Sequence, residues 1–243
     1  MQPRLTFDTC RARTAIRGWG RRLAELAAAA VLALAVLASP ADAGIVTRVE
    51  SGVPGTALLM MAGDFVGGET ARLKAEVSRL VPGQKVVLIL ESGGGLVDAG
   101  LELGRYIHAN RLATVVVAGG KGCHSACALA FQAGRDHRTG EPLRLMVSGA
   151  KLGFHQISAK FDPQRSYSGA DMAVAFEKSQ QGIAAIEAYF REIGANLEFL
   201  TLLLKAPSAS IALVNEFDAL RLGIHVMDQS TQRLLAPGDQ GRL

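Results

Sequence analysis

Runs of consecutive apolar residues alternate along this chain with stretches in which apolar residues recur every three or four positions. Continuous runs are typical of strands buried in a parallel sheet, and the longer spacing is typical of helices that pack one face on a core. The predicted strands lie at residues 57–61, 85–90, 113–118, 143–147, 151–155 and 224–227. The predicted helices lie at residues 70–80, 96–108, 126–133, 171–193, 197–204 and 215–222. This order predicts an α/β fold with a mainly parallel sheet, right-handed crossovers and a helical C-terminal segment.

Two of the predicted strands end in glycine-rich turns. The strand at 85–90 leads into Ser92-Gly-Gly-Gly95, and the strand at 113–118 leads into Gly119–Gly122. The carboxyl ends of parallel strands meet at one edge of a sheet, which is where α/β proteins bind their ligands. We therefore expect the two turns to open into one shared space.

Ser125 stands at the junction between the second glycine turn and the apolar helix predicted at 126–133. This position can present one hydroxyl beside backbone N–H groups that no helical carbonyl accepts from. Gly94 or Gly95 in the first turn and Ala126 after the serine are candidate N–H donors of an oxyanion hole. A nucleophilic serine also needs a base, which the chain must supply from elsewhere.

Five histidines are candidates for that base. His155 ends the predicted strand at 151–155 and could reach the same sheet edge, whereas His124 adjoins Ser125 in a turn, where neighbouring side chains point apart. Of the others, His108 lies at a helix end, His137 in the polar loop and His225 in the last strand. His155 is therefore the preferred base.

Residues 1–43 differ in composition from the rest of the chain. They contain six arginines, then an apolar run at 26–38, then Ser39-Pro-Ala-Asp-Ala43, a small-residue sequence typical of signal cleavage. We expect a secretory signal cleaved after Ala43, the alternative being an uncleaved N-terminal anchor that associates with a membrane through residues 26–38. The protein is accordingly expected in the periplasm or secreted.

The formal charge of +4 belongs mainly to this leader, because the remaining residues include 20 basic and 19 acidic side chains. No basic field suggests a nucleic-acid partner. We expect a single domain over residues 44–230 and a flexible Pro- and Gly-rich tail over 231–243.

Two of the three cysteines, Cys123 and Cys127, flank Ser125 four residues apart, and the third, Cys10, lies in the leader. One helical turn brings such a pair close to the range of a disulfide, which would brace the serine turn in an oxidising compartment. Two buried thiols on the core face of the helix are an equally good interpretation. No metal site is expected.

Three segments together resemble the Clp-type proteolytic subunit superfamily, in its secreted branch. They are Ser92–Gly100 (SGGGLVDAG), Gly122–Ala130 (GCHSACALA) and Phe154-His155-Gln156, in the order and spacing of that family. The resemblance covers residues 57–227 and implies a ClpP/crotonase-type spiral of ββα units. It also implies Ser125 as nucleophile, His155 as general base, and Gly94 or Gly95 with the Ala126 amide as the oxyanion hole.

The chain departs from the family pattern at two positions. Gly93 replaces the usual proline of the first turn, and residues 208–211 (SASI) contain no acid where the family has its third triad member. An acid there would orient the imidazole and stabilise its cation. Candidate substitutes are Ser210, Glu216 and Asp218.

The resulting prediction is a serine peptidase or hydrolase that cleaves peptide or acyl bonds with a Ser–His dyad. Three alternatives remain: a Ser–Lys peptidase using Lys121 or Lys151, a crotonase-like acyl-thioester enzyme, and a ClpP-fold binding or scaffold protein without activity. The expected partners are a peptide or protein substrate and further copies of the chain, with contacts near residues 157–168 as in the family. No cofactor and no ATPase partner are expected.

Overall fold

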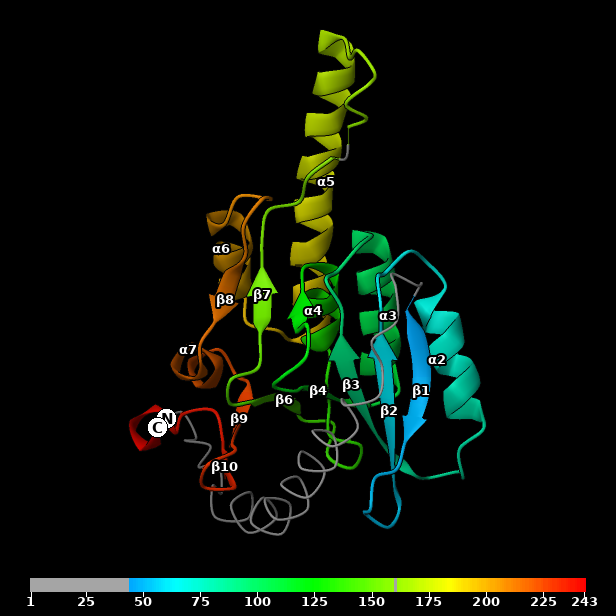
Figure 1. The fold of residues 1–243 in the computed structure, drawn as a ribbon, viewed down its shortest axis with the longest axis vertical. Coiled ribbons are helices and arrows are strands. Elements are labelled where there is room, and N and C mark those ends of the chain that lie inside the picture. The colour runs from blue at the N-terminus through cyan, green and yellow to red at the C-terminus, as the bar shows by residue number, and fades with distance from the viewer. Residues whose placement is uncertain (1–43, 160) are drawn as a thin grey trace, which may run out of the picture.

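The computed structural model describes residues 44–159 and 161–243, and its largest element is a seven-stranded sheet (Figure 1). The strands lie in the order β1 (Ile45–Val49), β2 (Thr56–Ala62), β3 (Lys85–Glu91), β4 (Ala113–Val116), β6 (Arg144–Val147), β9 (His225–Asp228) and β10 (Arg233–Leu235). The five central strands are parallel, and the two edge strands β1 and β10 pair antiparallel with their neighbours. The predicted α/β class with a mainly parallel sheet is confirmed.

A second, three-stranded sheet carries the serine turn. It consists of β5 (Cys123–His124), β7 (Leu152–Phe154) and β8 (Ala212–Val214), with β5 parallel and β8 antiparallel to β7. The strands β1, β5, β8 and β10 were absent from the sequence interpretation. Three of them, β5, β8 and β10, have only two or three residues, which is too short for a periodic pattern to show. The fourth, β1 (IVTRV), has polar residues within its apolar run.

The helices fall within a few residues of their predicted ranges. They are α2 (Glu69–Ser78), α3 (Val97–Ala109), α4 (Ala126–Phe131), α5 (Gly169–Ile193), α6 (Glu198–Lys205) and α7 (Glu216–Arg221). A short 3-10 turn, η2 (Gln240–Arg242), was not predicted. The ends of α5 follow local chemistry. Ser168 and Asp171 form a capping box at its start, and Gly194 takes the left-handed conformation at its end, with φ 65°. No helix in the described part of the chain is long and apolar enough to cross a membrane.

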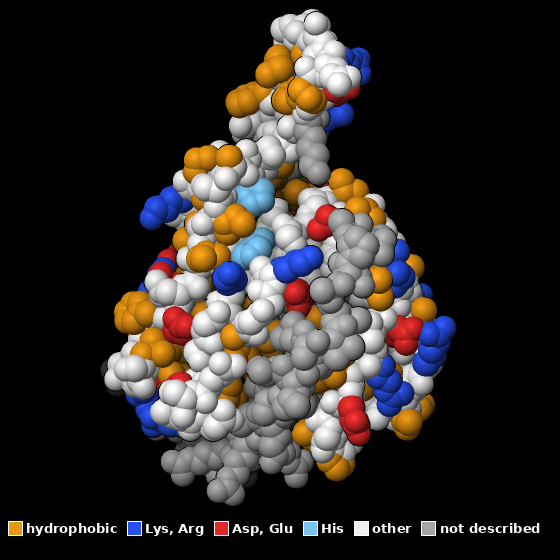
Figure 2. Space-filling view, viewed as in Figure 1, with side chains coloured by type: hydrophobic (Ala, Val, Ile, Leu, Met, Phe, Trp, Pro, Cys, Tyr) orange, Lys and Arg blue, Asp and Glu red, His pale blue; other side chains and the backbone are white. Residues whose placement is uncertain are grey.

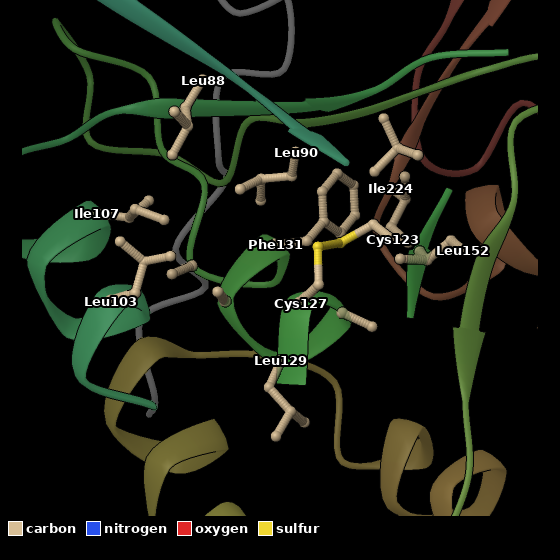
Figure 3. Packing of buried hydrophobic residues seen from close by; sticks show 14 of the residues in the cluster. Leu88, Leu90, Leu103, Ile107, Cys123, Cys127, Leu129, Phe131, Leu152 and Ile224 are labelled. Atoms are coloured by element: carbon tan, nitrogen blue, oxygen red, sulfur yellow. A yellow bond between two sulfur atoms is a disulfide. The ribbon is translucent and has the colours of Figure 1, made fainter. Parts of the chain in front are cut away.

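Helix α4 lies in the middle of the main core, and all six of its residues are buried. Figure 3 shows Cys127, Leu129 and Phe131 of this helix with Leu103 and Ile107 of α3 on one side and Leu152 of β7 on the other. Alternate residues of the central strands, such as Leu88 and Leu90, complete this cluster from one face of the sheet. Ser125 is therefore attached to the most deeply packed helix of the domain.

Helix α5 has two unlike halves. Its C-terminal half buries Ile186, Tyr189 and Phe190 in the core, and its N-terminal half extends beyond the rest of the molecule (Figure 1). Apolar side chains are exposed on this projecting end (Figure 2), among them Met172 and Phe176, the latter 68% exposed. The C-terminal half of α5 thus holds the helix in the core, and its N-terminal half presents apolar side chains to solvent.

The predictions for the two ends of the chain have different outcomes. Residues 1–43, with the expected signal or anchor, its apolar run at 26–38 and Cys10, lie outside the described residues. Within the expected flexible tail, residues 233–235 form β10 on the sheet edge, and Leu235 is buried because it packs on the main core. That part of the tail belongs to the folded domain.

Candidate active site

The structure brings the two glycine turns side by side. The Ser92 N–H donates to the Gly122 carbonyl at 2.8 Å, and the His124 N–H donates to the Ser92 carbonyl at 3.0 Å. Gly94 lies directly against the serine, since a Cβ placed on it would come within 2.6 Å of the Ser125 Cβ. The first turn needs glycine at this position because no side chain fits between the two turns.

Ser125 has an uncommon backbone conformation for a residue with a side chain, with φ 56° and ψ −124°. Its N–H donates to the Gly153 carbonyl at 3.0 Å, and its carbonyl accepts from the Leu129 N–H at 3.1 Å. Such a conformation costs about 1–3 kcal/mol and is characteristic of functional sites, where the surrounding structure enforces it. Here β5, β7 and α4 hold the serine on a sharp strand-to-helix turn.

A cavity of about 290 Å³ opens beside Ser125, and His155 lines it as well. Several apolar side chains form other parts of its wall, including Val97, Leu129, Ile157, Ile186 and Leu203. The serine and histidine selected from the sequence thus face the same space. Their side chains do not hydrogen bond to each other in the structure, and catalytic contacts of this kind often tighten only when substrate binds.

Two backbone N–H groups next to Ser125 have no acceptor among the described residues, those of Gly95 and Ala126. The Gly94 N–H, in contrast, donates to Ser92 Oγ at 3.0 Å. Of the two alternatives in the first turn, Gly95 therefore has the available donor. Gly95 has φ 140°, and a Cβ on it would lie 2.1 Å from the Phe65 carbonyl oxygen, so a glycine is required there.

The His155 ring is oriented by a backbone carbonyl. Its Nδ1 lies 2.8 Å from the Gln156 carbonyl oxygen, which can only accept, so Nδ1 carries the proton and donates. This leaves Nε2 unprotonated in the neutral ring. Gln156 is itself fixed to the end of α6: its side-chain amide donates to the Leu204 carbonyl at 2.7 Å, and its N–H donates to the Ala206 carbonyl at 2.9 Å.

None of the three candidate third members lines the cavity or contacts His155 in the described structure. Ser210 donates to the Pro207 carbonyl, Glu216 accepts from the Gly149 N–H, and Asp218 pairs with Arg221. The sequence could not indicate the Gln156 carbonyl as the orienting group, because every residue has a backbone carbonyl.

The other candidate bases lie elsewhere. His124 is buried, its Nε2 donates to the Lys121 carbonyl at 3.0 Å, and its pKa is lowered, mainly by burial. Lys121 and Lys151 are exposed and do not line the cavity. His108, His137 and His225 do not line it either.

Cys123 and Cys127 form a disulfide, with their Cα atoms 5.2 Å apart (Figure 3). The bridge joins β5 to α4 and thereby closes a loop around Ser125. Of the two interpretations that the sequence left open, the structure shows the bridge rather than two free thiols.

Asp64 also lines the cavity, and the sequence analysis did not select it. It follows β2, a parallel neighbour of β3, so it lies at the same carboxyl edge as the glycine turns. The polar pair Gly63-Asp64 directly after a buried strand was the available signal. No group of three or more His, Cys, Asp or Glu in residues 44–159 and 161–243 is arranged to hold a metal ion.

Helices α3 and α4 pack closely beneath the site, and this packing can be tested by substitution. A Cβ on Gly100 would lie 2.5 Å from the carbonyl oxygen of Ala126, the residue after the serine. Gly100→Ala is therefore expected to lower the free energy of unfolding by about 1–3 kcal/mol, as overpacking does. Chemical denaturation measures this free energy. Gly169→Ala is the control, because no atom beyond its chain neighbours and helix backbone lies within 4 Å of a Cβ placed at that position. Equal stability of the two variants would contradict this packing.

The comparisons with known proteins assign no family. A scan against protein-family models finds no match, and a search of curated proteins finds none.

Proposed function

We propose that this protein is a serine hydrolase that cleaves peptide or acyl bonds, with Ser125 as nucleophile and His155 as general base. One observation carries the proposal: a serine on an enforced strand-to-helix turn shares a cavity with an oriented imidazole and lies beside two unused N–H donors. A nucleophile, a base and an oxyanion hole are the parts that acyl transfer requires.

The reaction follows from these positions. His155 Nε2 accepts the Ser125 hydroxyl proton as Oγ attacks the substrate carbonyl carbon, and the N–H groups of Gly95 and Ala126 donate to the oxyanion that forms. The imidazolium then protonates the leaving amine or alcohol, which departs and leaves an acyl-serine. Water attacks this ester with His155 again taking a proton, and Ser125 is regenerated.

The Gln156 carbonyl replaces the carboxylate of a triad in one of its two roles. It fixes the imidazole tautomer and orientation, as an acid would. It carries no full negative charge, so it stabilises the imidazolium less than an acid does. We therefore infer a slower enzyme than one with a complete triad.

We infer that the fold is the ClpP/crotonase-type spiral that the sequence resemblance implies. The successive β–α units, the parallel main sheet and the separate small sheet carrying the serine support this assignment. A non-catalytic binding protein of the same fold is the alternative, favoured because no carboxylate of the described residues contacts His155. The crotonase-like acyl-thioester enzyme is less well supported, because its chemistry does not need the serine.

Location and self-association stay predictions. The disulfide is compatible with the proposed position outside the cytoplasm. The exposed apolar end of α5 lies next to the region from which the resemblance predicts contacts between copies of the chain. These two features support the proposals.

A fluorophosphonate probe tests the proposed activity. We expect the probe to label the folded protein at Ser125, identified by peptide mass mapping, and not to label the heat-denatured protein. Lys121→Ala and Lys151→Ala are expected to label at the rate of the original protein, because neither lysine lines the cavity. An unlabelled protein would favour the binding-protein alternative, and slow labelling of a lysine variant would favour the Ser–Lys mechanism.

A further inference from the structure

We propose that Asp64 makes this cavity selective for substrates that carry a positive charge beside the bond to be cleaved, such as the ammonium or guanidinium of a basic peptide. The inference rests on the proposed function, because it names the substrate class of the same site.

The main chain holds Asp64 over the first glycine turn. The carbonyl of Asp64 accepts from the Gly44 N–H at 3.0 Å, and the next residue, Phe65, donates its N–H to the Gly94 carbonyl at 2.8 Å. A Cβ on Gly93 would lie 3.8 Å from Asp64 Oδ1. The carboxylate therefore stands beside the turn that supplies the Gly95 donor, at the wall of the cavity.

No side chain among residues 44–159 and 161–243 neutralises the charge of Asp64. Its carboxylate makes no hydrogen bond or ion pair within the part of the chain that the structure describes. The nearby Arg72 is engaged elsewhere, with Glu69 at 2.6 Å and with the carbonyls of Gly44 and Gly67. Glu69 in turn accepts from the N–H groups of Val66 and Gly67, so its charge is compensated where that of Asp64 is not.

The rest of the cavity wall adds no opposing charge. No lysine or arginine is among its described lining residues, and the other titratable lining group is His155. A substrate cation at Asp64 meets an unpaired carboxylate, whereas a substrate anion meets a like charge in a concave site. The apolar wall formed by Leu129, Ile186 and Leu203 leaves room for an uncharged side chain, so charge selection falls to Asp64 alone.

Internally quenched peptides with a single central leucine test this selectivity. In one set of peptides, Lys, Gln or Glu stands directly before or directly after the leucine. A further pair of peptides differs only in whether the N-terminus is free or acetylated. For the original protein we expect kcat/KM to be about five- to tenfold higher with Lys than with Glu, as for a partly exposed charge pair. Asp64→Asn should remove this ratio and Asp64→Lys should invert it. Asp98→Asn, which removes an exposed carboxylate outside the cavity, should preserve it.

A binding assay separates this inference from the proposed function. Fluorescence anisotropy with the same Lys and Glu peptides, carrying a single dye, is measured on Ser125→Ala and on Ser125→Ala/Asp64→Asn. Tighter binding of the Lys peptide that disappears with Asp64→Asn supports the inference even where fluorophosphonate labelling has failed. A Lys-to-Glu ratio unchanged by Asp64→Asn, in binding and in hydrolysis, would overturn the inference and leave the serine hydrolase proposal standing.

Discussion

Ser125→Ala is expected to lower hydrolysis of an internally quenched peptide or a p-nitrophenyl ester by about 10³-fold or more, because it removes the atom that attacks the substrate. Alanine keeps the Cβ, so the packing of the turn against Gly94 is retained and the stability should change little. The measurement is the initial rate at saturating substrate, with chemical denaturation alongside it.

Two further variants make this prediction specific. Ser158→Ala removes another hydroxyl from the same cavity and should leave the rate near that of the original protein. Ser125→Gly should also be inactive but more stable by about 1 kcal/mol, because glycine adopts positive φ without strain. A Ser125→Ala variant that keeps its activity would move the nucleophile elsewhere and reject the proposed mechanism.

His155→Ala is the second large effect that we expect, a loss of about 10²–10⁴-fold in both fluorophosphonate labelling and hydrolysis. The loss follows from removing the only imidazole whose Nε2 is left free within the described cavity lining. Because nucleophile and base act as a unit, the Ser125→Ala/His155→Ala double variant should be little slower than either single variant.

His137→Ala is the matched control for this prediction, since that histidine is exposed in a loop away from the cavity. Its labelling rate should equal that of the original protein. Normal labelling of His155→Ala would show that another group activates the serine, and additive losses in the double variant would show that the two residues act separately.

The larger features of the fold could be predicted because they depend on long patterns. The apolar run of β3 covers five consecutive residues and the periodic spacing of α3 extends over thirteen, which is enough for each pattern to appear. The serine position could be predicted for a related reason: glycines mark sharp turns, and an apolar helix directly after them fixes which residue stands at the junction.

The parts that escaped prediction have no side-chain signature. The two residues of β5 become a strand only through pairing with β7, a partner nearly thirty positions away. The group that orients His155 is the Gln156 carbonyl, and Gln156 is positioned by hydrogen bonds to the end of α6, which lies far from it in the sequence. Glu216 and Asp218 had suitable chemistry, but Glu216 accepts from the distant Gly149 N–H, and Asp218 contacts Asn215 and Arg221 around α7.

The bridge between Cys123 and Cys127 has a consequence for the order of folding. Its sequence separation is four residues, so closing it costs little loop entropy and needs none of the distant strand pairings. In an oxidising compartment it can therefore close whether or not β5 has paired with β7, because the two cysteines are neighbours in the sequence. The bridge would then limit the conformations open to the turn around Ser125, and the pairing of β5 with β7 would complete the conformation that the folded protein shows.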